Sequence, residues 1–222
     1  FTPTVDSEGW SAEGHTVVEV VTDDMPFLVD SVTMALDEIG HDVHLVLHPQ
    51  LVVRRDVAGH LQEVLDDHAD VSPHDIGRES WMHLEIDRIP AEEITPVQQQ
   101  LEKVLSDVRE AVEDWPRMHD RVQVILDDLD EHPPPLPPGE LEEGKAFLRW
   151  LADNHFTFLG YREYRLERHG EHEVLIALPG TGFGILRADP GEATALPQPA
   201  ADKAREKTLL VLAKANSRAT VH

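Results

Sequence analysis

A strand that leads directly into a helix constrains the fold of this chain more than any other feature of its sequence. Residues 15–21 read His-Thr-Val-Val-Glu-Val-Val, a β-branched run typical of a strand buried on both faces. Apolar residues then recur at helical spacing, at Leu28, Val32, Leu36 and Ile39. Asp24 is placed to cap this helix and Pro26 to be its first residue, while Gly40 marks its end. The chain therefore begins with a strand, a short acidic turn and an amphipathic helix.

The turn itself is a candidate ligand site. A helix N-terminus presents backbone N–H groups and the positive end of the helix dipole, which together can hold the carboxylate of a small ligand. The predicted site consists of Asp23, Asp24, Met25, Phe27 and Leu28. In this arrangement Asp23 or Asp24 would face the ammonium group of an amino acid. The alternative is a well-capped helix that binds nothing.

Composition excludes several classes of partner. The chain has 222 residues, with 43 acidic against 19 basic side chains and a net charge of −24. Such a charge repels nucleic acid and anionic lipid, so we expect neither a nucleic-acid nor a membrane partner. The absence of cysteine excludes disulfides and thiolate chemistry, and it fits a cytoplasmic location. The first residues carry neither an initiator Met nor a signal sequence, which predicts a fragment of a longer protein.

The remainder of the first 130 residues predicts more strands and two helices. Residues 42–55 favour a strand or a hairpin broken near Pro49, residues 59–65 an answering strand and residues 66–78 a loop. Residues 80–87 alternate as a half-buried strand. For the next helix the pattern predicts Thr95 as N-cap, Pro96 as first residue and Gln98 as the partner in a capping box, with an apolar stripe at Leu101, Val104, Leu105, Val108 and Val112. Residues 121–129 predict a further helix.

A proline-rich segment at residues 131–139 is the predicted linker between two domains, 1–130 and 140–222. After it the pattern predicts a helix over 140–153 whose apolar residues face inward. Strands at 156–166 and 173–178 then form a hairpin. Residues 189–201 indicate a loop and residues 208–216 a last strand.

Two motifs suggest chemistry that their context does not support. Gly180-Thr181-Gly182-Phe183-Gly184 is spaced like a dinucleotide loop, but Pro179 precedes it and a strand-like segment follows, which favours a turn. The 14 histidines show no metal-ligand spacing, and no Ser/His/Asp set is visible. We therefore expect no catalytic residue, no metal site and no cofactor in this chain.

The order β-α-β-β-α, with Asp23-Asp24-Met25-Pro26-Phe27-Leu28 at its first turn, resembles an ACT domain. That family is a small ferredoxin-like regulatory module that binds amino acids at this turn. Phe27 stands where the family usually has Gly, and its ring would crowd the approach of a ligand.

A broader resemblance rests on three segments: 22–31, 154–164 (Asn-His-Phe-Thr-Phe-Leu-Gly-Tyr-Arg-Glu-Tyr) and 214–222. Together they resemble the N-terminal region of the large bacterial NAD-specific glutamate dehydrogenases. The resemblance implies an α+β fold, in which a ferredoxin-like ACT-type βαββαβ module precedes a helix and a truncated β-rich module, PAS-like or a second ACT-like domain.

The resemblance also implies a function. The whole enzyme would convert L-glutamate to 2-oxoglutarate and ammonium with NAD, whereas this non-catalytic region would sense amino acids or support assembly. Its partners would be the rest of the polypeptide and the other subunits of a homo-oligomer. The alternative is a purely structural module that mediates subunit contacts without a ligand.

Overall fold

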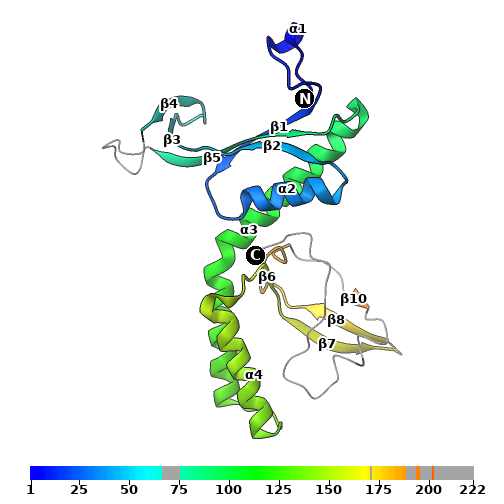
Figure 1. The fold of residues 1–222 in the computed structure, drawn as a ribbon. Helices are drawn as coiled ribbons and strands as arrows, with labels where there is room; N and C mark the ends of the chain where they lie inside the picture. The colour runs from blue at the N-terminus through cyan, green and yellow to red at the C-terminus, as the bar shows by residue number, and fades with distance from the viewer. Residues whose placement is uncertain (67–75, 171, 189–193, 196–201, 203–222) are drawn as a thin grey trace. The chain divides into compact units, whose positions relative to one another are not determined.

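The computed structural model describes residues 1–66, 76–170, 172–188, 194–195 and 202 (Figure 1). The prediction for 208–216 and most of the predicted loops 66–78 and 189–201 concern residues outside these ranges, although Thr194–Ala195 are described and form a strand. The described residues divide into two compact units, unit 1 up to Ser106 and unit 2 from Asp107 onward. Each is α+β, which confirms the predicted fold class at that level. No helix among the described residues is long and apolar enough to cross a membrane.

Unit 1 is built around a five-stranded antiparallel sheet. Its strands are β1 (Thr16–Asp23), β2 (Val43–Leu47), β3 (Gln50–Arg55), β4 (Leu61–Leu65) and β5 (Gly77–Ile86). Strand β5 pairs with β1 along one edge and with both β2 and β3 along the other, and β4 adds to β3. Because β2 and β3 share one edge of β5, they are one strand interrupted at His48 and Pro49, not a hairpin. The answering strand predicted at 59–65 is confirmed as β4.

One face of this sheet forms the core of unit 1. Met82, Leu84 and Ile86 of β5 are fully buried on it, as the alternation predicted. Helix α2 (Leu28–Glu38) and the first part of α3 (Ala91–Glu131) cover this face (Figure 1). The prediction that β1 is buried on both faces was wrong, because Glu19, Val21 and Asp23 are exposed on its other face. A short helix, α1 (Val5–Glu8), precedes the sheet.

Helix α2 ends as predicted but begins later. Gly40 has φ 85°, its N–H donates to Asp37 C=O, and His41 N–H donates to Leu36 C=O. These are the two bonds of a Schellman motif. At the other end Phe27 is the N-cap, with φ 72°, and no side chain caps the helix. Pro26 lies in the turn before it, so the roles predicted for Asp24 and Pro26 were wrong.

Helix α3 is a single helix of 41 residues. It begins at Ala91 directly after Pro90, so Thr95 is not its N-cap and Pro96 is not its first residue. Gln98 donates to Glu102 at 2.7 Å instead of completing a capping box. The segment 121–129 continues the same helix. A proline inside a helix costs about 3 kcal/mol. The burial of an apolar stripe along α3 offsets this cost. The stripe consists of Val97, Leu101, Val104, Val108, Met118, Val122 and Leu126.

Unit 2 contains the second part of α3, helix α4 (Pro138–Trp150) and a π-helical turn at Leu151–His155. Its strands are β6 (Gly160–Tyr161), β7 (Tyr164–His169), β8 (His172–Ala177), β9 (Phe183–Gly184) and β10 (Thr194–Ala195). The predicted hairpin is confirmed as β7 and β8, while β6 pairs with β9.

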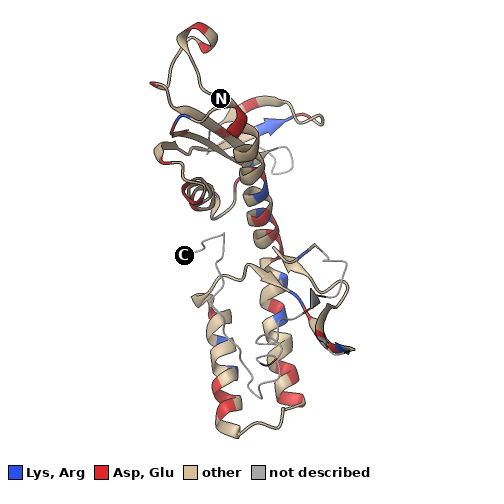
Figure 2. Ribbon diagram, turned by 90° about the vertical axis from the view of Figure 1, so that its right-hand side faces the viewer, with Lys and Arg blue, Asp and Glu red and all other residues tan. Residues whose placement is uncertain are grey.

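The proline-rich segment connects two helices of unit 2 that lie side by side (Figures 1 and 2). Buried Lys145 of α4 donates to Asp130 of α3 and, at 2.9 Å, to Glu142. The apolar residues predicted to face inward, such as Leu141 and Leu148, are only half-buried. Acidic residues lie along both helices (Figure 2). The domain division at 131–139 and the PAS-like or second ACT-like identity of unit 2 stay predictions.

Candidate functional site

The turn between β1 and α2 brings the five predicted ligand residues together. Strand β1 ends at Asp23, and the Asp24 N–H donates to Arg78 C=O at 2.9 Å, which fixes the turn to β5. Asp24 Oδ1 accepts a hydrogen bond from Gln50 Nε2 at 2.9 Å. Leu28 is fully buried and anchors the helix in the core, so its side chain cannot contact a ligand.

The first turn of α2 carries backbone N–H groups without a described acceptor. Ser31 is the first residue whose N–H closes a helical bond, donating to Phe27 C=O at 3.0 Å. The N–H groups of residues 28–30 therefore have no intrahelical partner, and no described side chain caps them. They give this end of α2 a partial positive charge, with Asp23, Asp24 and Asp30 close in sequence.

Two further features mark this turn. Phe27 adopts the left-handed conformation, φ 72°, which glycine tolerates without cost and other residues do not. The resemblance to the ACT domain predicts Gly at this position, and the backbone adopts a conformation that suits Gly. The Ser31 hydroxyl, one turn into the helix, is buried and has no hydrogen-bond partner among the described residues.

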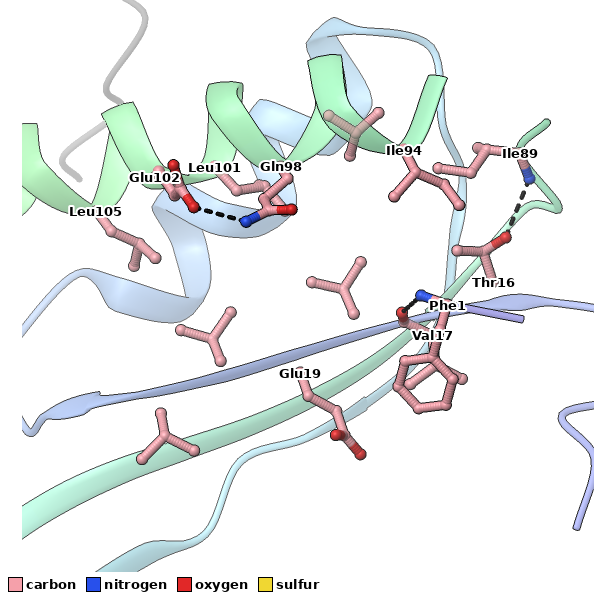
Figure 3. Close-up of a pocket in the computed structure, with 14 residues that line it drawn as sticks. Phe1, Thr16, Val17, Glu19, Ile89, Ile94, Gln98, Leu101, Glu102 and Leu105 are labelled. Carbon is pink, nitrogen blue, oxygen red and sulfur yellow. Dashed lines mark hydrogen bonds between the residues drawn. The ribbon is translucent and has the colours of Figure 1, made fainter. Parts of the chain in front are cut away.

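Unit 1 also contains a cavity of about 480 Å³ that the sequence did not reveal. It lies between the outer part of β1 and the first part of α3 (Figure 3). Its apolar lining includes Val18, Val20, Ile94, Val97, Leu101 and Leu105, and none of the five predicted ligand residues takes part. Only the pairing of distant elements creates it, so no local pattern could have indicated it.

In unit 2 the carboxylate of Asp114 is the centre of a buried polar cluster. It is 2% exposed and accepts hydrogen bonds from the Gly184 N–H and from Arg187 Nε, both at 2.9 Å. Burial opposes its ionisation, but the hydrogen bonds from Arg187 and Gly184 outweigh burial and lower the pKa of Asp114. The cluster ties β9 to α3 and is structural in character.

Two glycines of the motif at 180–184 lie in tight contact with neighbouring backbone. A Cβ on Gly184 would lie 2.1 Å from Leu159 C=O, and one on Gly182 would lie 2.3 Å from Leu186 C=O. The motif forms the turn between β8 and β9, as predicted, although Ile185 and Leu186 continue as a turn and not as a strand.

Several described histidines of unit 1 pair with carboxylates or hydroxyls. His44 Nε2 lies 2.7 Å from Asp87 Oδ1, and His48 Nε2 lies 2.6 Å from Ser80 Oγ. His15 stacks on His44 with ring centroids 4.4 Å apart. Within the described ranges, no three His, Asp or Glu side chains are placed to hold a metal ion.

Unit 1 has a sheet with two helices on one face, and helix α2 starts directly after the first strand. Residues 1–101 match the model of the family described as glutamate dehydrogenase, ACT1 domain. Unit 1 is thus an ACT-like domain.

Three relatives make the assignment more specific, and each is an NAD-specific glutamate dehydrogenase. The protein of Pseudomonas aeruginosa is 36% identical over 188 residues, covering 84% of this chain and 11% of the relative. That of Halomonas elongata is 34% identical over 190 residues, covering 84% of this chain and 12% of the relative. That of Mycobacterium tuberculosis is 28% identical over 206 residues, covering 89% of this chain and 12% of the relative. The chain belongs to the ACT1-domain region of the NAD-specific glutamate dehydrogenases, and it spans 11–12% of the length of these curated relatives.

Proposed function

We propose that this chain is a non-catalytic part of a longer NAD-dependent glutamate dehydrogenase and senses an amino acid for it. The longer protein would oxidise L-glutamate to 2-oxoglutarate and ammonium with NAD, whose binding site would lie outside this chain. The relatives' names and the short share of their length that the chain covers support this assignment. The region would act in the cytoplasm, within a homo-oligomer.

The observation that carries the sensing role is the uncapped first turn of α2. Its N–H groups would bind an α-carboxylate, because the helix dipole favours a negative charge there. Asp24, held in place by Gln50, would attract the ammonium group of the same ligand. A zwitterion thus fits this turn better than a simple anion, which the neighbouring carboxylates would repel.

Calorimetry against a panel of amino acids at millimolar concentration tests this role. Asp24→Asn keeps the acceptor for Gln50 but loses the charge, so the affinity should fall by roughly tenfold. Asp37→Asn, at the other end of α2, is the matched control and should bind as the parent does. If no amino acid produces heat with either the chain or the full-length polypeptide, the sensing role is wrong.

A second function, assembly of subunits, is favoured by an aromatic cluster in unit 2. Trp150 stacks on His155 with centroids 4.9 Å apart and on Phe147 at 5.8 Å. Trp150 is nevertheless 42% exposed and Phe156 61% exposed, and large exposed aromatic groups are enriched in protein interfaces.

Sedimentation of the full-length polypeptide tests this second function. Replacing Trp150 and Phe156 together by Ala should shift the oligomer toward smaller species. Val124→Ala, which removes an exposed apolar residue outside the cluster, should not. An oligomer unchanged by the aromatic substitutions would exclude this surface from assembly.

A further inference from the structure

The cavity between β1 and α3 leaves apolar side chains open on the face of the sheet that otherwise forms the core. Leu84 of β5, which lies opposite Val18, is fully buried. Val18 itself is only half-buried, and so is Val20, because the cavity opens beside them (Figure 3). An apolar wall that is open in this way favours the binding of an apolar group.

The opposite wall of the cavity belongs to α3 and is also apolar. Leu101 and Leu105 line it, and both lie in unit 1, as β1 does. The volume of about 480 Å³ lies within the range of small-molecule sites, roughly 300–1,000 Å³. The cavity is therefore large enough for a small organic ligand.

The backbone of β1 adds polar groups to these walls. Val17 bonds outward to Phe1 through its C=O and its N–H, at 2.9 and 2.7 Å. Alternate residues of a strand direct their backbone groups to the same edge, so Glu19 and Val21, which both line the cavity, direct theirs outward as well. The Glu19 carboxylate lies on the other face of the sheet, 3.5 Å from His83 Nδ1. Glu19 and Val21 thus offer the cavity carbonyl oxygens and N–H groups.

The α3 wall carries one acidic side chain at the rim of the cavity. Glu102 Oε1 accepts a hydrogen bond from Gln98 Nε2 at 2.7 Å (Figure 3). Both side chains are exposed. No Lys, Arg or His takes part among the described residues that line the cavity, whose only charged side chains are Glu19 and Glu102. Because these side chains are acidic, the site attracts a cation and repels an anion.

We propose that this cavity binds a primary amine with an apolar body. The body lies between Val20 and Leu101, and the ammonium group lies at the rim beside Glu102. An ammonium group has three donors and no acceptor, and the Glu102 carboxylate and the outward carbonyl oxygens of β1 are acceptors. None of the five residues predicted at the turn before α2 lines this cavity, so the site is separate from the proposed sensing site.

Three probes of similar shape and different charge test the proposal. Calorimetry of the full-length polypeptide compares phenethylamine, phenethyl alcohol and phenylacetate at millimolar concentration. Phenethylamine should bind, the alcohol should bind roughly tenfold more weakly because it lacks the charge, and phenylacetate should give no heat. Equal affinities for amine and alcohol, or no heat with any probe, would overturn the proposal.

A substitution at the rim tests the assigned contact. Glu102→Gln should lower the affinity for phenethylamine by roughly tenfold and leave that for the alcohol unchanged, because only the amine uses the charge. Glu92→Gln is the matched control, since Glu92 is exposed on the same helix and does not line the cavity. It should change neither affinity. An unchanged affinity of Glu102→Gln for phenethylamine would show that the ammonium lies elsewhere.

Filling the cavity tests where the apolar body lies. Leu105→Trp places a larger side chain at a half-buried position of the α3 wall and should abolish binding of both the amine and the alcohol. Thermal unfolding shows whether this variant folds, and Val20→Phe fills the same space from β1 if it does not. Phenethylamine binding by a folded, filled variant would contradict the site. Phenethylamine has no carboxylate for the turn before α2, so an absence of heat with amino acids contradicts only the sensing role.

Discussion

At the scale of single residues, a few backbone positions of this protein have unusual conformations. Among the described residues, Glu13, Phe27 and Asn154 have positive φ without being glycine, and Gly184 has positive φ with no space for a side chain. Substitutions at these positions therefore separate backbone strain from the loss of side-chain packing.

Phe27 can be replaced by two small residues that differ only in backbone freedom. Phe27→Gly and Phe27→Ala lose the same ring, but Ala keeps the strain of φ 72°. We expect the Gly variant to be more stable than the Ala variant by about 1 kcal/mol. Urea unfolding measures the difference, and equal stabilities would mean that the turn relaxes. The Gly variant should also bind an amino acid more tightly if the ring restricts access.

Gly184→Ala should be one of the most damaging substitutions in unit 2. A Cβ there would lie 2.1 Å from Leu159 C=O, and displacement of Gly184 would break its bond to buried Asp114. We expect a loss of about 3 kcal/mol of unfolding free energy. Gly180→Ala has positive φ and open space around it, so it should cost only about 1 kcal/mol. Similar losses in the two variants would show that φ alone decides.

At the scale of elements, ion pairs at two neighbouring positions of β3 differ in geometry. Arg55 donates through Nε and Nη2 to both oxygens of Glu79 on β5, at 2.6 and 2.8 Å. Arg54 makes one bond to exposed Glu63 on β4, at 2.7 Å. The first pair links β3 to the central strand, and the second lies at the sheet's border.

Arg55→Lys should therefore destabilise the protein more than Arg54→Lys. Lysine cannot reproduce the two parallel bonds of the guanidinium group to Glu79. We expect the melting temperature to fall by roughly 3 °C or more for Arg55→Lys. An exposed single bond contributes little, so Arg54→Lys should fall within about 1 °C of the parent. Thermal scans at one salt concentration compare them, and equal shifts would contradict the role of the bidentate geometry.

At the scale of the whole molecule, two carboxylates make stability depend on pH. The hydrogen bond from Arg55 outweighs burial and lowers the pKa of Glu79, and Arg187 with Gly184 does the same for Asp114. A carboxyl group with a lower pKa in the folded state stabilises the fold above its unfolded pKa, and that contribution is lost as the pH falls through the folded value. Both residues should therefore favour acid denaturation below about pH 4.

The net charge of −24 acts in the opposite sense, because protonation relieves repulsion among the acidic residues. In 0.15 M salt, interactions between exposed charges more than about 8 Å apart are largely screened, whereas buried ion pairs are screened much less. We therefore expect the loss of the buried pairs at low pH to outweigh the relief of repulsion. Denaturant unfolding at pH 7 and pH 3 measures this. The Asp114→Asn variant should have a lower free energy of unfolding than the parent protein at pH 7. Its free energy of unfolding should also fall less than that of the parent between pH 7 and pH 3. An equal fall in the two proteins would exclude Asp114 as a source of the acid sensitivity.

Elements with strong local patterns could be predicted well. The strand, turn and helix from Thr16 to Glu38, the half-buried strand β5 and the hairpin β7–β8 all follow from alternation or helical spacing. Helix starts were predicted less well, because cap residues compete with tertiary packing. Thr95 and Pro96 have the chemistry of a helix start, yet the buried stripe of α3 extends the helix through them.

The candidate sites also differ in how far the sequence could indicate them. The turn from Asp23 to Leu28 could be proposed as a site because strand end, acidic residues and helix start are adjacent in sequence, and the site and its ligand stay predictions. The cavity beside β1 and the cluster around Asp114 could not be found, because Val18 and Leu101, or Asp114 and Gly184, are far apart along the chain.

The sequence by itself determined where the backbone can form strands and helices and which family the chain resembles, since these depend on neighbouring residues. Only the tertiary structure decided that Phe27 and not Asp24 precedes α2 and that β2 and β3 share one edge of β5. The physical reason is that hydrogen bonds between strands and the burial of side chains join residues that the sequence separates.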